Sequence, residues 1–459
     1  MNPLKKYSQV ILPFLVLITP VILLAFSTGR FFQQEDLKGK YAYKNFETAG
    51  KCGSCHKGIY QQWTQAMMSQ AYTHEWDEIE YFDLAVAHSK IKPGLKEVAD
   101  GCNGCHTPLA YMNGSLPPAR PSEKTMANES VSCEVCHLIQ SAGTDPPHNY
   151  SYLIGPGTTK YAYRTPSVES PAHKIVTSEF FRTTEFCANC HNEKNQYGVW
   201  VKSTQLEWKE GPYSKEGVRC QDCHMPKGGP FLNALMSKPY DDARLHLFHG
   251  AHDPGKVRGV IELRINPDIR EAEPGETIVF TVVLFNQKTG HKFPTGSVED
   301  RIAWLQVEAA DAKGKIYHLN VDKKGFEGEE YTISGNDTAY QDMGVPLGIA
   351  DFRGVSRDGI PAGNRIFRMP YFDPEGRMTI MQWNTTKLGT DYRIGPREAK
   401  VETFTFRLPY DVAPGAMTVM AVLNYQLLVK PVADLLKVPE KESRIMVVND
   451  HSTTVNILP

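Results

Sequence analysis

Ten cysteines are the residues of this sequence whose type and spacing best indicate chemistry. They form five Cys-x-x-Cys pairs, and a histidine directly follows each pair. The five motifs are Cys52–His56, Cys102–His106, Cys133–His137, Cys187–His191 and Cys220–His224. Because histidine accounts for only 15 of 459 residues, five histidines in these positions would arise by chance with a probability of roughly 10^-7 to 10^-8. The repeated motif therefore serves a common chemical purpose.

Three familiar uses of paired cysteines explain this pattern poorly. Disulfides between cysteines three residues apart close very small loops, which constrain the unfolded chain little. Zinc sites use four ligands, so five pairs divide unevenly among them and the trailing histidine has no role. A thioredoxin-like redox pair occurs once beside a β-α-β unit and does not recur five times. The remaining interpretation is covalent haem c, for which Cys-x-x-Cys-His is the attachment motif.

The spacing within the motif suits haem chemistry. Two thiols three residues apart on a helical turn can form thioethers to one haem, and the adjacent histidine can bind its iron as proximal ligand. The sequence therefore predicts five covalently bound haem c groups. The predicted thioether cysteines are Cys52, Cys55, Cys102, Cys105, Cys133, Cys136, Cys187, Cys190, Cys220 and Cys223, and the predicted proximal ligands are His56, His106, His137, His191 and His224.

The overall composition is that of a globular protein with more than one domain. A length of 459 residues allows about three domains of ~150 residues each. With 41% hydrophobic and 22% charged residues, the chain is not a disordered, fibrous or polytopic membrane protein. Its formal net charge of -2 argues against a nucleic-acid partner, because nucleic-acid binding requires a basic face.

The first 30 residues have the pattern of an export segment. Lys5 and Lys6 precede an apolar run over residues 10–26, and positive residues before such a run stay on the cytoplasmic side. The run is long for the core of a signal peptide and at the short limit for a membrane-spanning helix. We predict an N-terminal membrane anchor helix over residues 1–30, with a cleaved signal peptide as the alternative. Either one predicts a location on the periplasmic side of the inner membrane.

The rest of the chain divides into two regions of different character. Residues 31–255 contain all five motifs and predict a mostly α or irregular pentahaem cytochrome c domain. From residue 256 cysteine is absent, and alternating β-branched runs between turn signals predict an all-β, immunoglobulin-like sandwich over residues 256–459. The predicted strands are 260–265, 277–285, 302–309, 401–408, 417–423 and 444–448, with a long insertion of loops between about 322 and 398.

The second axial position of each iron decides between an electron carrier and a catalyst. A protein ligand there gives a low-spin carrier, whereas an open position gives a possible catalyst. Outside the motifs, more histidines precede residue 300 than five irons need: His74, His88, His148, His173, His246, His249, His252 and His291. His318 and His451 lie in predicted β segments, where a structural role is expected.

The first motif and the residues after it resemble the multihaem cytochromes c related to hydroxylamine oxidoreductase and to the tetrahaem cytochrome that accepts its electrons. In that family the first motif is commonly followed by Tyr and then by Trp-x-x-Ser-x-His, whose histidine is a distal ligand. The corresponding residues here are Tyr60, Trp63, Ala66 and Met68, so a methionine occupies the histidine position. The resemblance implies that Met68 binds the first iron, which would make this haem more oxidising than bis-histidine haems. Packing of Met68 in the core is the alternative.

Three further segments are similar to the same family. His173 ends a Ser-Pro-Ala-His sequence before the fourth motif, and His246 begins a His-x-Phe-x-Gly sequence after the last motif. His291 lies in a Gly-His-x-Phe-Pro-Thr-Gly sequence, similar to a loop by which the β-domain of such cytochromes reaches a haem. The resemblance implies these three histidines as distal ligands. His88 and His148 compete for the remaining iron.

Three functions follow as alternatives. The first is a membrane-associated periplasmic pentahaem cytochrome that transfers electrons along its haems between respiratory partners. The second is a multihaem oxidoreductase with one open haem that acts on a small nitrogen or sulfur compound. The third is a docking subunit of a larger electron-transfer assembly, formed through the β-domain. We favour a carrier over a catalyst, with redox proteins as partners and a membrane contact through the N-terminal segment.

Overall fold

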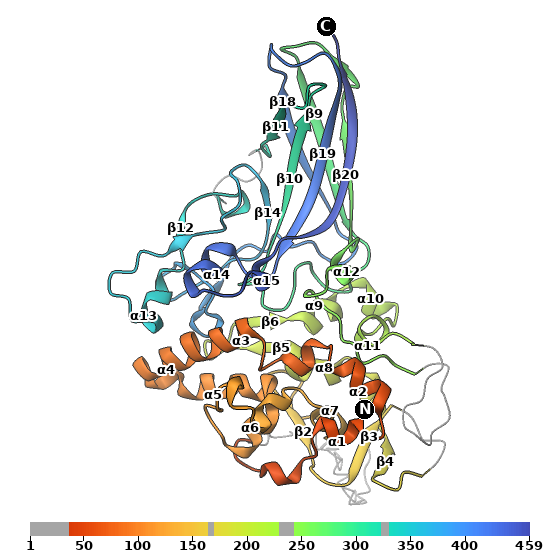
Figure 1. Ribbon diagram of the computed structural model, residues 1–459, viewed down its shortest axis with the longest axis vertical. Helices are drawn as coiled ribbons and strands as arrows, with labels where there is room; N and C mark the ends of the chain where they lie inside the picture. The colour runs from red at the N-terminus through yellow and green to blue at the C-terminus, as the bar shows by residue number, and fades with distance from the viewer. Residues whose placement is uncertain (1–35, 164–168, 229–242, 323–329) are drawn as a thin grey trace, which may run out of the picture. The chain divides into compact units, whose positions relative to one another are not determined.

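Short helices carry the five motifs in the computed structural model, which describes residues 36–163, 169–228, 243–322 and 330–459 (Figure 1). The motif-bearing helices are α1 (Ala49–Gly53), α5 (Lys96–His106), α7 (Cys133–Leu138), α8 (Glu185–His191) and α11 (Cys220–His224). Residues three and four positions apart lie on one face of a helix. Four motifs lie wholly inside their helices, so each presents both thiols and its imidazole toward one side.

Further short helices and three two-stranded sheets connect the motifs. The connecting helices include α2 (Lys57–Trp63), η2 (Met67–Gln70), α3 (Glu75–Ile79), η3 (Glu80–Val86), α4 (Ala87–Ile91), α6 (Pro108–Asn113), α9 (Thr204–Glu210), α10 (Pro212–Lys215) and α12 (Pro254–Val257). The sheets pair β1 (Ile139–Ala142) with β2 (Tyr152–Ile154), β3 (Thr159–Ala162) with β4 (Lys174–Thr177), and β5 (Asn192–Lys194) with β6 (Trp200–Ser203). These short elements enclose a small hydrophobic cluster that includes Leu109, Met112 and Leu138.

Two larger sheets form the second half of the chain, and their long strands run side by side (Figure 1). One sheet has the order β18 (Ala399–Arg407), β9 (Thr277–Asn286), β7 (Ile261–Pro267). The other has the order β11 (Ile316–Leu319), β10 (Ile302–Ala310), β19 (Gly415–Gln426), β20 (Met446–Ile457), β8 (Glu271–Ala272). Alternate residues of the strands point inward, as in β9, where Ile278, Phe280 and Val282 are fully buried. These side chains belong to one hydrophobic core.

A second hydrophobic core joins the two halves of the chain. Trp76 of α3 and Leu84 of η3 pack in the same cluster as Trp304 of β10 and Trp383. The segments that complete it include α13 (Gly344–Leu347), β14 (Arg365–Phe367), β16 (Met378–Thr379) and α14 (Lys430–Leu436). The strand β15 (Tyr371–Phe372) pairs with β16, and the helix α15 (Glu440–Ser443) follows α14. Residues Gln34–Pro459 therefore form one compact unit.

The coarse architecture agrees with the sequence analysis. A helical, irregular region with the haem motifs precedes a β-rich region, and each of the six predicted strands overlaps an observed strand. Among the described residues, no helix combines the length and the apolar character that crossing a bilayer requires. The predicted anchor over residues 1–30 lies outside the described residues.

Candidate haem-binding site

Three motif histidines bind backbone carbonyls through Nδ1. The acceptors are the carbonyl oxygens of Ala71 for His106 (2.7 Å), Tyr161 for His137 (2.7 Å) and His249 for His224 (3.3 Å). A carbonyl can only accept, so each Nδ1 carries the proton and each neutral ring has its lone pair on Nε2. This arrangement is the one in which imidazole binds a metal, since ligating histidines typically donate their other N–H to a carbonyl. The motif residues therefore fit haem iron.

Three of the predicted distal histidines have the same arrangement. Nδ1 of His148, His246 and His291 lies 2.8, 3.0 and 2.9 Å from the carbonyl oxygens of Pro146, Arg244 and Lys292. Each ring is thus fixed in the tautomer whose Nε2 can bind a metal.

Two predicted distal histidines face motif histidines. The ring centroids of His56 and His173 are 6.1 Å apart with an interplanar angle of 25°, and those of His224 and His291 are 6.3 Å apart with an angle of 20°. Two metal–nitrogen bonds of about 2 Å each separate imidazole centroids by roughly 6 Å. Each pair therefore leaves the space that one iron between two imidazoles requires.

His246 lies near the third motif. Burial, and to a smaller extent the nearby His137, lowers the pKa of His246 to about 4. The backbone N–H of His246 donates to Gln62 Oε1 at 2.8 Å, which ties the residue to α2. The ring therefore stays neutral at physiological pH, as a metal ligand must.

His148 lies against the fourth motif. The side chain of Asn192, the residue after His191, donates to the carbonyl of Pro147 at 3.1 Å. The ring of His148 packs edge-on against Trp200 of β6 with centroids 5.1 Å apart. The residue is thus held beside α8 and β6.

His88 has a different environment. It is 1% exposed, and Trp383 Nε1 donates to its Nδ1 at 3.2 Å. Because the indole can only donate, Nδ1 is the acceptor and the proton of the neutral ring is on Nε2. Burial lowers the pKa of His88 to about 4, so the ring is neutral. Because Nε2 carries the proton in this tautomer, it offers no lone pair to iron.

Met68 lies in η2, near the third motif as well as the first. Its carbonyl accepts the backbone N–H of Val131 at 3.0 Å, two residues before Cys133. The sequence pattern favours Met68 as a ligand of the first iron. His173, which faces His56 of the first motif, is a second candidate for the same position.

His74 is engaged by carboxylates through both ring nitrogens. Its Nε2 lies 2.6 Å from Glu442 of α15 and its Nδ1 lies 3.3 Å from Asp77. Although burial alone would lower it, these carboxylates raise the pKa of His74 to about 9. The ring is therefore an imidazolium that links α3 to α15, and His252 packs edge-on against it with centroids 4.9 Å apart.

Thiols of different motifs lie next to one another. The thiols of Cys52 and Cys133, of Cys105 and Cys190, and of Cys187 and Cys220 lie close enough to shift one another's pKa. The first motif thus lies beside the third, the second beside the fourth, and the fourth beside the fifth. Haems attached to neighbouring thiols are neighbours as well.

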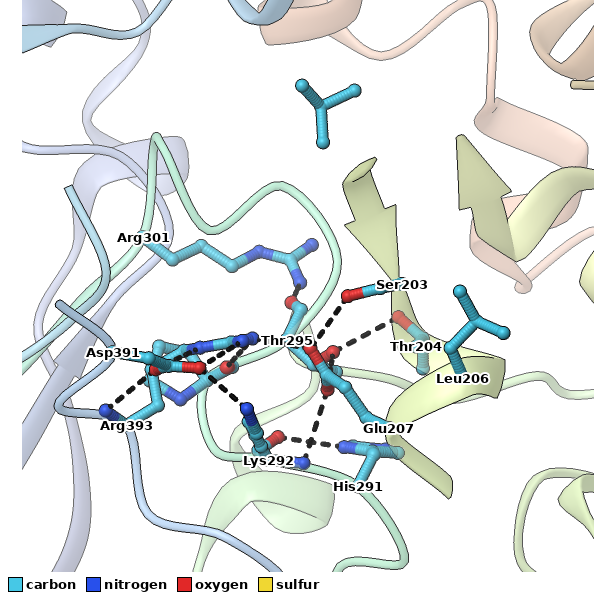
Figure 2. Close-up of polar contacts among 12 residues, drawn as sticks. Ser203, Thr204, Leu206, Glu207, His291, Lys292, Thr295, Arg301, Asp391 and Arg393 are labelled. Atoms are coloured by element: carbon cyan, nitrogen blue, oxygen red, sulfur yellow. Dashed lines mark hydrogen bonds and ion pairs between the residues drawn. The ribbon is translucent and has the colours of Figure 1, made fainter. Parts of the chain in front are cut away.

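The loop that carries His291 is held by a buried ion-pair network (Figure 2). Glu207 of α9 accepts the backbone N–H of Lys292 (3.2 Å) and the hydroxyl of Thr295 (2.7 Å). Its second oxygen lies 2.7 Å from Arg393 Nη1, and Arg393 also pairs with Asp391 at 2.8 Å. The side chains of Arg393 and Glu207 are only 2% and 5% exposed. Removal of either side chain would therefore leave a buried, unpaired charge and destabilise the fold.

Asp391 and Arg393 of this network stabilise each other in the charged state. Burial alone would raise the pKa of Asp391, but Arg393 and Lys292 hold it well below its usual value. Glu207 and Asp391 correspondingly keep the pKa of Arg393 above its usual value despite burial. The Asp391 carboxylate and the Arg393 guanidinium, which help to hold the loop, therefore both remain charged near neutral pH.

Sequence reasoning missed this network. Glu207, Asp391 and Arg393 lie in different segments, and no local pattern connects them. The only signal was the loop itself, whose His291 the family resemblance had singled out.

Two family models match parts of the chain. The model described as cytochrome c554 and c-prime matches residues 51–138, and that of the NapC/NirT cytochrome c family, N-terminal region, matches residues 171–254. No curated protein matches the chain.

The chain also resembles solved structures. A penta-heme cytochrome c552 from Thermochromatium tepidum is 18% identical, and the match covers 92% of this chain and 100% of that one with a TM-score of 0.59. The CARDB domain of the PF1109 protein from Pyrococcus furiosus is 10% identical over 43% of this chain and 87% of its own, with a TM-score of only 0.19.

These findings agree with the five motifs. The chain is a multihaem electron-transfer cytochrome with covalently bound haem c. It shares with the penta-heme cytochrome a fold that extends over nearly its whole length.

Proposed function

We propose that this cytochrome conducts electrons between redox proteins through five haems whose irons all carry protein ligands on both sides. The observation that carries this proposal is the pairing of His56 with His173 and of His224 with His291, each pair separated by the room for one iron. An iron with two protein ligands has no open position for a substrate. Such sites favour electron transfer over catalysis.

The ligand set follows from the contacts of each residue. The ten motif cysteines form the thioethers, and the five motif histidines are the proximal ligands. His173, His246 and His291 are the distal ligands of the first, third and fifth irons. His148, beside α8 and β6, remains for the fourth iron. Met68 remains for the second iron, because His106 bonds the carbonyl of Ala71, which directly follows η2. The sequence pattern also makes Met68 a competitor of His173 for the first iron. We assign His88 a structural role beside Trp383.

The adjacent thiols support an order of electron transfer. Contacts of the first motif with the third, the second with the fourth, and the fourth with the fifth make these haems neighbours. Cys136 of the third motif also lies close enough to Cys187 of the fourth to affect its pKa, which makes these two motifs neighbours. Electrons would pass from the first haem through the third and fourth to the fifth, with the second beside the fourth.

Spectra of the oxidised protein test this proposal. We expect electron paramagnetic resonance to detect only low-spin ferric haem, five per chain. A stoichiometric high-spin haem that binds cyanide, nitrite or hydroxylamine would contradict it and favour an oxidoreductase with an open iron.

Two variants identify the distal ligand of the first haem. If His173 is the ligand, His173→Ala will convert about one fifth of the haem to high spin, because one of five irons loses an imidazole. Met68→Ala will then open a different iron, the second, and abolish the weak red charge-transfer band of a methionine-ligated ferric haem, so the double variant will convert about two fifths of the haem. If Met68 is instead the ligand of the first iron, His173→Ala will leave the spectrum unchanged and the double variant will convert only about one fifth. Absorption and paramagnetic resonance spectra of both variants decide between them.

The remaining features of the proposal concern location and architecture. We place the protein on the periplasmic side of the inner membrane, anchored by residues 1–30, with a cytochrome domain over 31–255 and a β-domain over 256–459. The sheet orders β18–β9–β7 and β11–β10–β19–β20–β8 support an immunoglobulin-like topology, because they pair strands as the two sheets of that fold do. The proposal also includes membership of the family related to hydroxylamine oxidoreductase. It further includes docking onto partner proteins through the β-domain.

A further inference from the structure

A group of ionisable side chains is buried where the haem region meets the loop before β10. Its centre is Glu299, whose side chain is 0% exposed. Both carboxylate oxygens of Glu299, and Oδ1 of the adjacent Asp300, lack a hydrogen-bond partner within the described ranges. The Lys202 ammonium of β6 lies 3.9 Å from Glu299 but only 2.9 Å from Glu193. A fully buried carboxyl group thus has no partner of its own.

The charges that face Glu299 do not neutralise it. Arg368 directs its guanidinium to the backbone carbonyl of Glu299 at 2.9 Å and to the Tyr340 hydroxyl at 3.1 Å. Arg301 donates to the carbonyl of Thr295. The surrounding titratable and charged groups are Asp77 and Glu80 from α3 and η3, Glu193 and Lys202 from β5 and β6, Asp300 and Arg301 beside it, Arg368 after β14, and Tyr371 of β15. Carboxyl groups therefore outnumber the cations that are free to pair with them.

A buried carboxylate without a partner is unfavourable, so the group binds a proton instead. Burial raises the pKa of Glu299 to about 8, with Lys202 opposing the rise and Asp300 adding to it. Burial likewise raises the pKa of Glu80 to about 8. Glu299 is therefore mostly protonated at neutral pH and loses its proton only in mildly alkaline solution.

This group of carboxyls lies within electrostatic range of two haem motifs. The pKa of the Cys102 thiol is raised by burial and then by the charges of Glu193 and Glu80. Burial lowers the pKa of His191, and Arg301 and Lys202 lower it further. The contacts give the same proximity. Glu193, which pairs with Lys202, is two residues after His191, and Trp76, which donates to Asp300 at 3.1 Å, belongs to the hydrophobic cluster against which Cys102 packs.

We propose that in mildly alkaline solution Glu299 takes up a proton when an electron reaches the haems of the second and fourth motifs. The proposal rests on the electron-transfer function proposed above and adds proton binding to it. One electron from the donor protein converts one iron from ferric to ferrous, and one proton from water converts the Glu299 carboxylate into a carboxylic acid. Oxidation by the acceptor protein reverses both changes.

The midpoint potential of a haem near Glu299 depends on pH in one direction. Reduction removes one positive charge near Glu299 and so raises its proton affinity. Below about pH 8 the group is protonated in both oxidation states, and the midpoint potential does not depend on it. Above about pH 8 the oxidised protein loses the proton before the reduced protein does. The potential then falls as pH rises, by up to 59 mV for each tenfold decrease in proton activity, the one-electron conversion.

Spectroelectrochemical titration of the haem-loaded protein between pH 7 and 10 tests the proposal. In the wild type we expect one or two of the five midpoint potentials to fall above pH 8. Glu299→Gln, which has the same shape but cannot ionise, is expected to reduce that fall, and the double variant Glu80→Gln/Glu299→Gln to remove it, because burial also raises the pKa of Glu80 to about 8. Infrared difference spectra of reduction should show the band of a protonated carboxyl in the wild type, a weaker band in Glu299→Gln and none in the double variant.

Asp342→Asn is the matched control. Asp342 is also buried, at 3% exposed, and burial also raises its pKa, but the charges that act on it are those of Asp373 and Arg377. This variant should keep the wild-type pH dependence. Equal pH dependence in wild type and Glu299→Gln would overturn the proposal. A stoichiometric high-spin signal in the wild type would instead overturn the electron-transfer function, so the two failures are distinguishable.

Discussion

Replacing Arg393 by alanine is expected to lower the free energy of unfolding by about 3–5 kcal/mol, because it leaves a buried carboxylate without its partner. Arg393 is the only guanidinium that the described contacts give to Glu207, which also holds the backbone of Lys292 and the hydroxyl of Thr295. Its loss leaves Glu207 without a guanidinium, whereas Asp391 keeps the Lys292 ammonium at 2.8 Å. Denaturation by urea, followed by circular dichroism, measures the change.

Arg397→Ala is the matched control for this prediction. Arg397 pairs with Glu216 at 2.8 Å, but the two side chains are 46% and 41% exposed. Water can replace the lost partner at such a site, so the expected cost is below about 1 kcal/mol. Equal destabilisation by both variants would contradict the view that burial makes the Arg393 network important.

The parts of this structure that sequence could predict are those specified locally. Each Cys-x-x-Cys-His motif lies within five consecutive residues, because one haem must reach all three side chains. The strand predicted over 277–285 corresponds to β9 (Thr277–Asn286), because one face of the strand packs in the core and alternation marks it. Both signals are complete within a short stretch of chain.

The last strand was predicted only in part. The prediction covered 444–448, whereas β20 extends over Met446–Ile457. The part beyond the prediction begins near Asp450, His451 and Ser452, which are polar and exposed. Pairing with β19 along the whole strand specifies this part, and such pairing leaves little trace in the strand's own sequence.

Contacts between distant segments could not be predicted. Trp76 donates to Asp300 over 224 positions of sequence, and Trp383 donates to His88 over 295. These bonds join the haem region to the β-rich region. The second bond also fixes the tautomer of a histidine that sequence alone made a candidate ligand. A single sequence carries no periodicity that relates such partners.

His291→Ala is expected to convert one of the five haems from low spin to high spin. The ring of His291 faces His224 at 6.3 Å, and its Nδ1 donates to its neighbour's carbonyl, which leaves Nε2 for the iron. Alanine removes the sixth ligand and leaves the proximal histidine in place, so the haem stays attached but its iron becomes open. Paramagnetic resonance should show a high-spin signal of about one fifth of the total haem, and this signal should change on addition of cyanide.

His249→Ala separates the loss of a ligand from the loss of a nearby histidine. The side chain of His249 pairs with Asp253 at 2.9 Å, and only its backbone carbonyl contacts the ring of His224. Alanine keeps that carbonyl, so the spectrum should remain fully low spin. Arg393→Ala should show a smaller high-spin fraction than His291→Ala, because it loosens the loop without removing the imidazole. If His291→Ala stays fully low spin, another residue binds the fifth iron, and the network around Glu207 supports the fold without positioning a ligand.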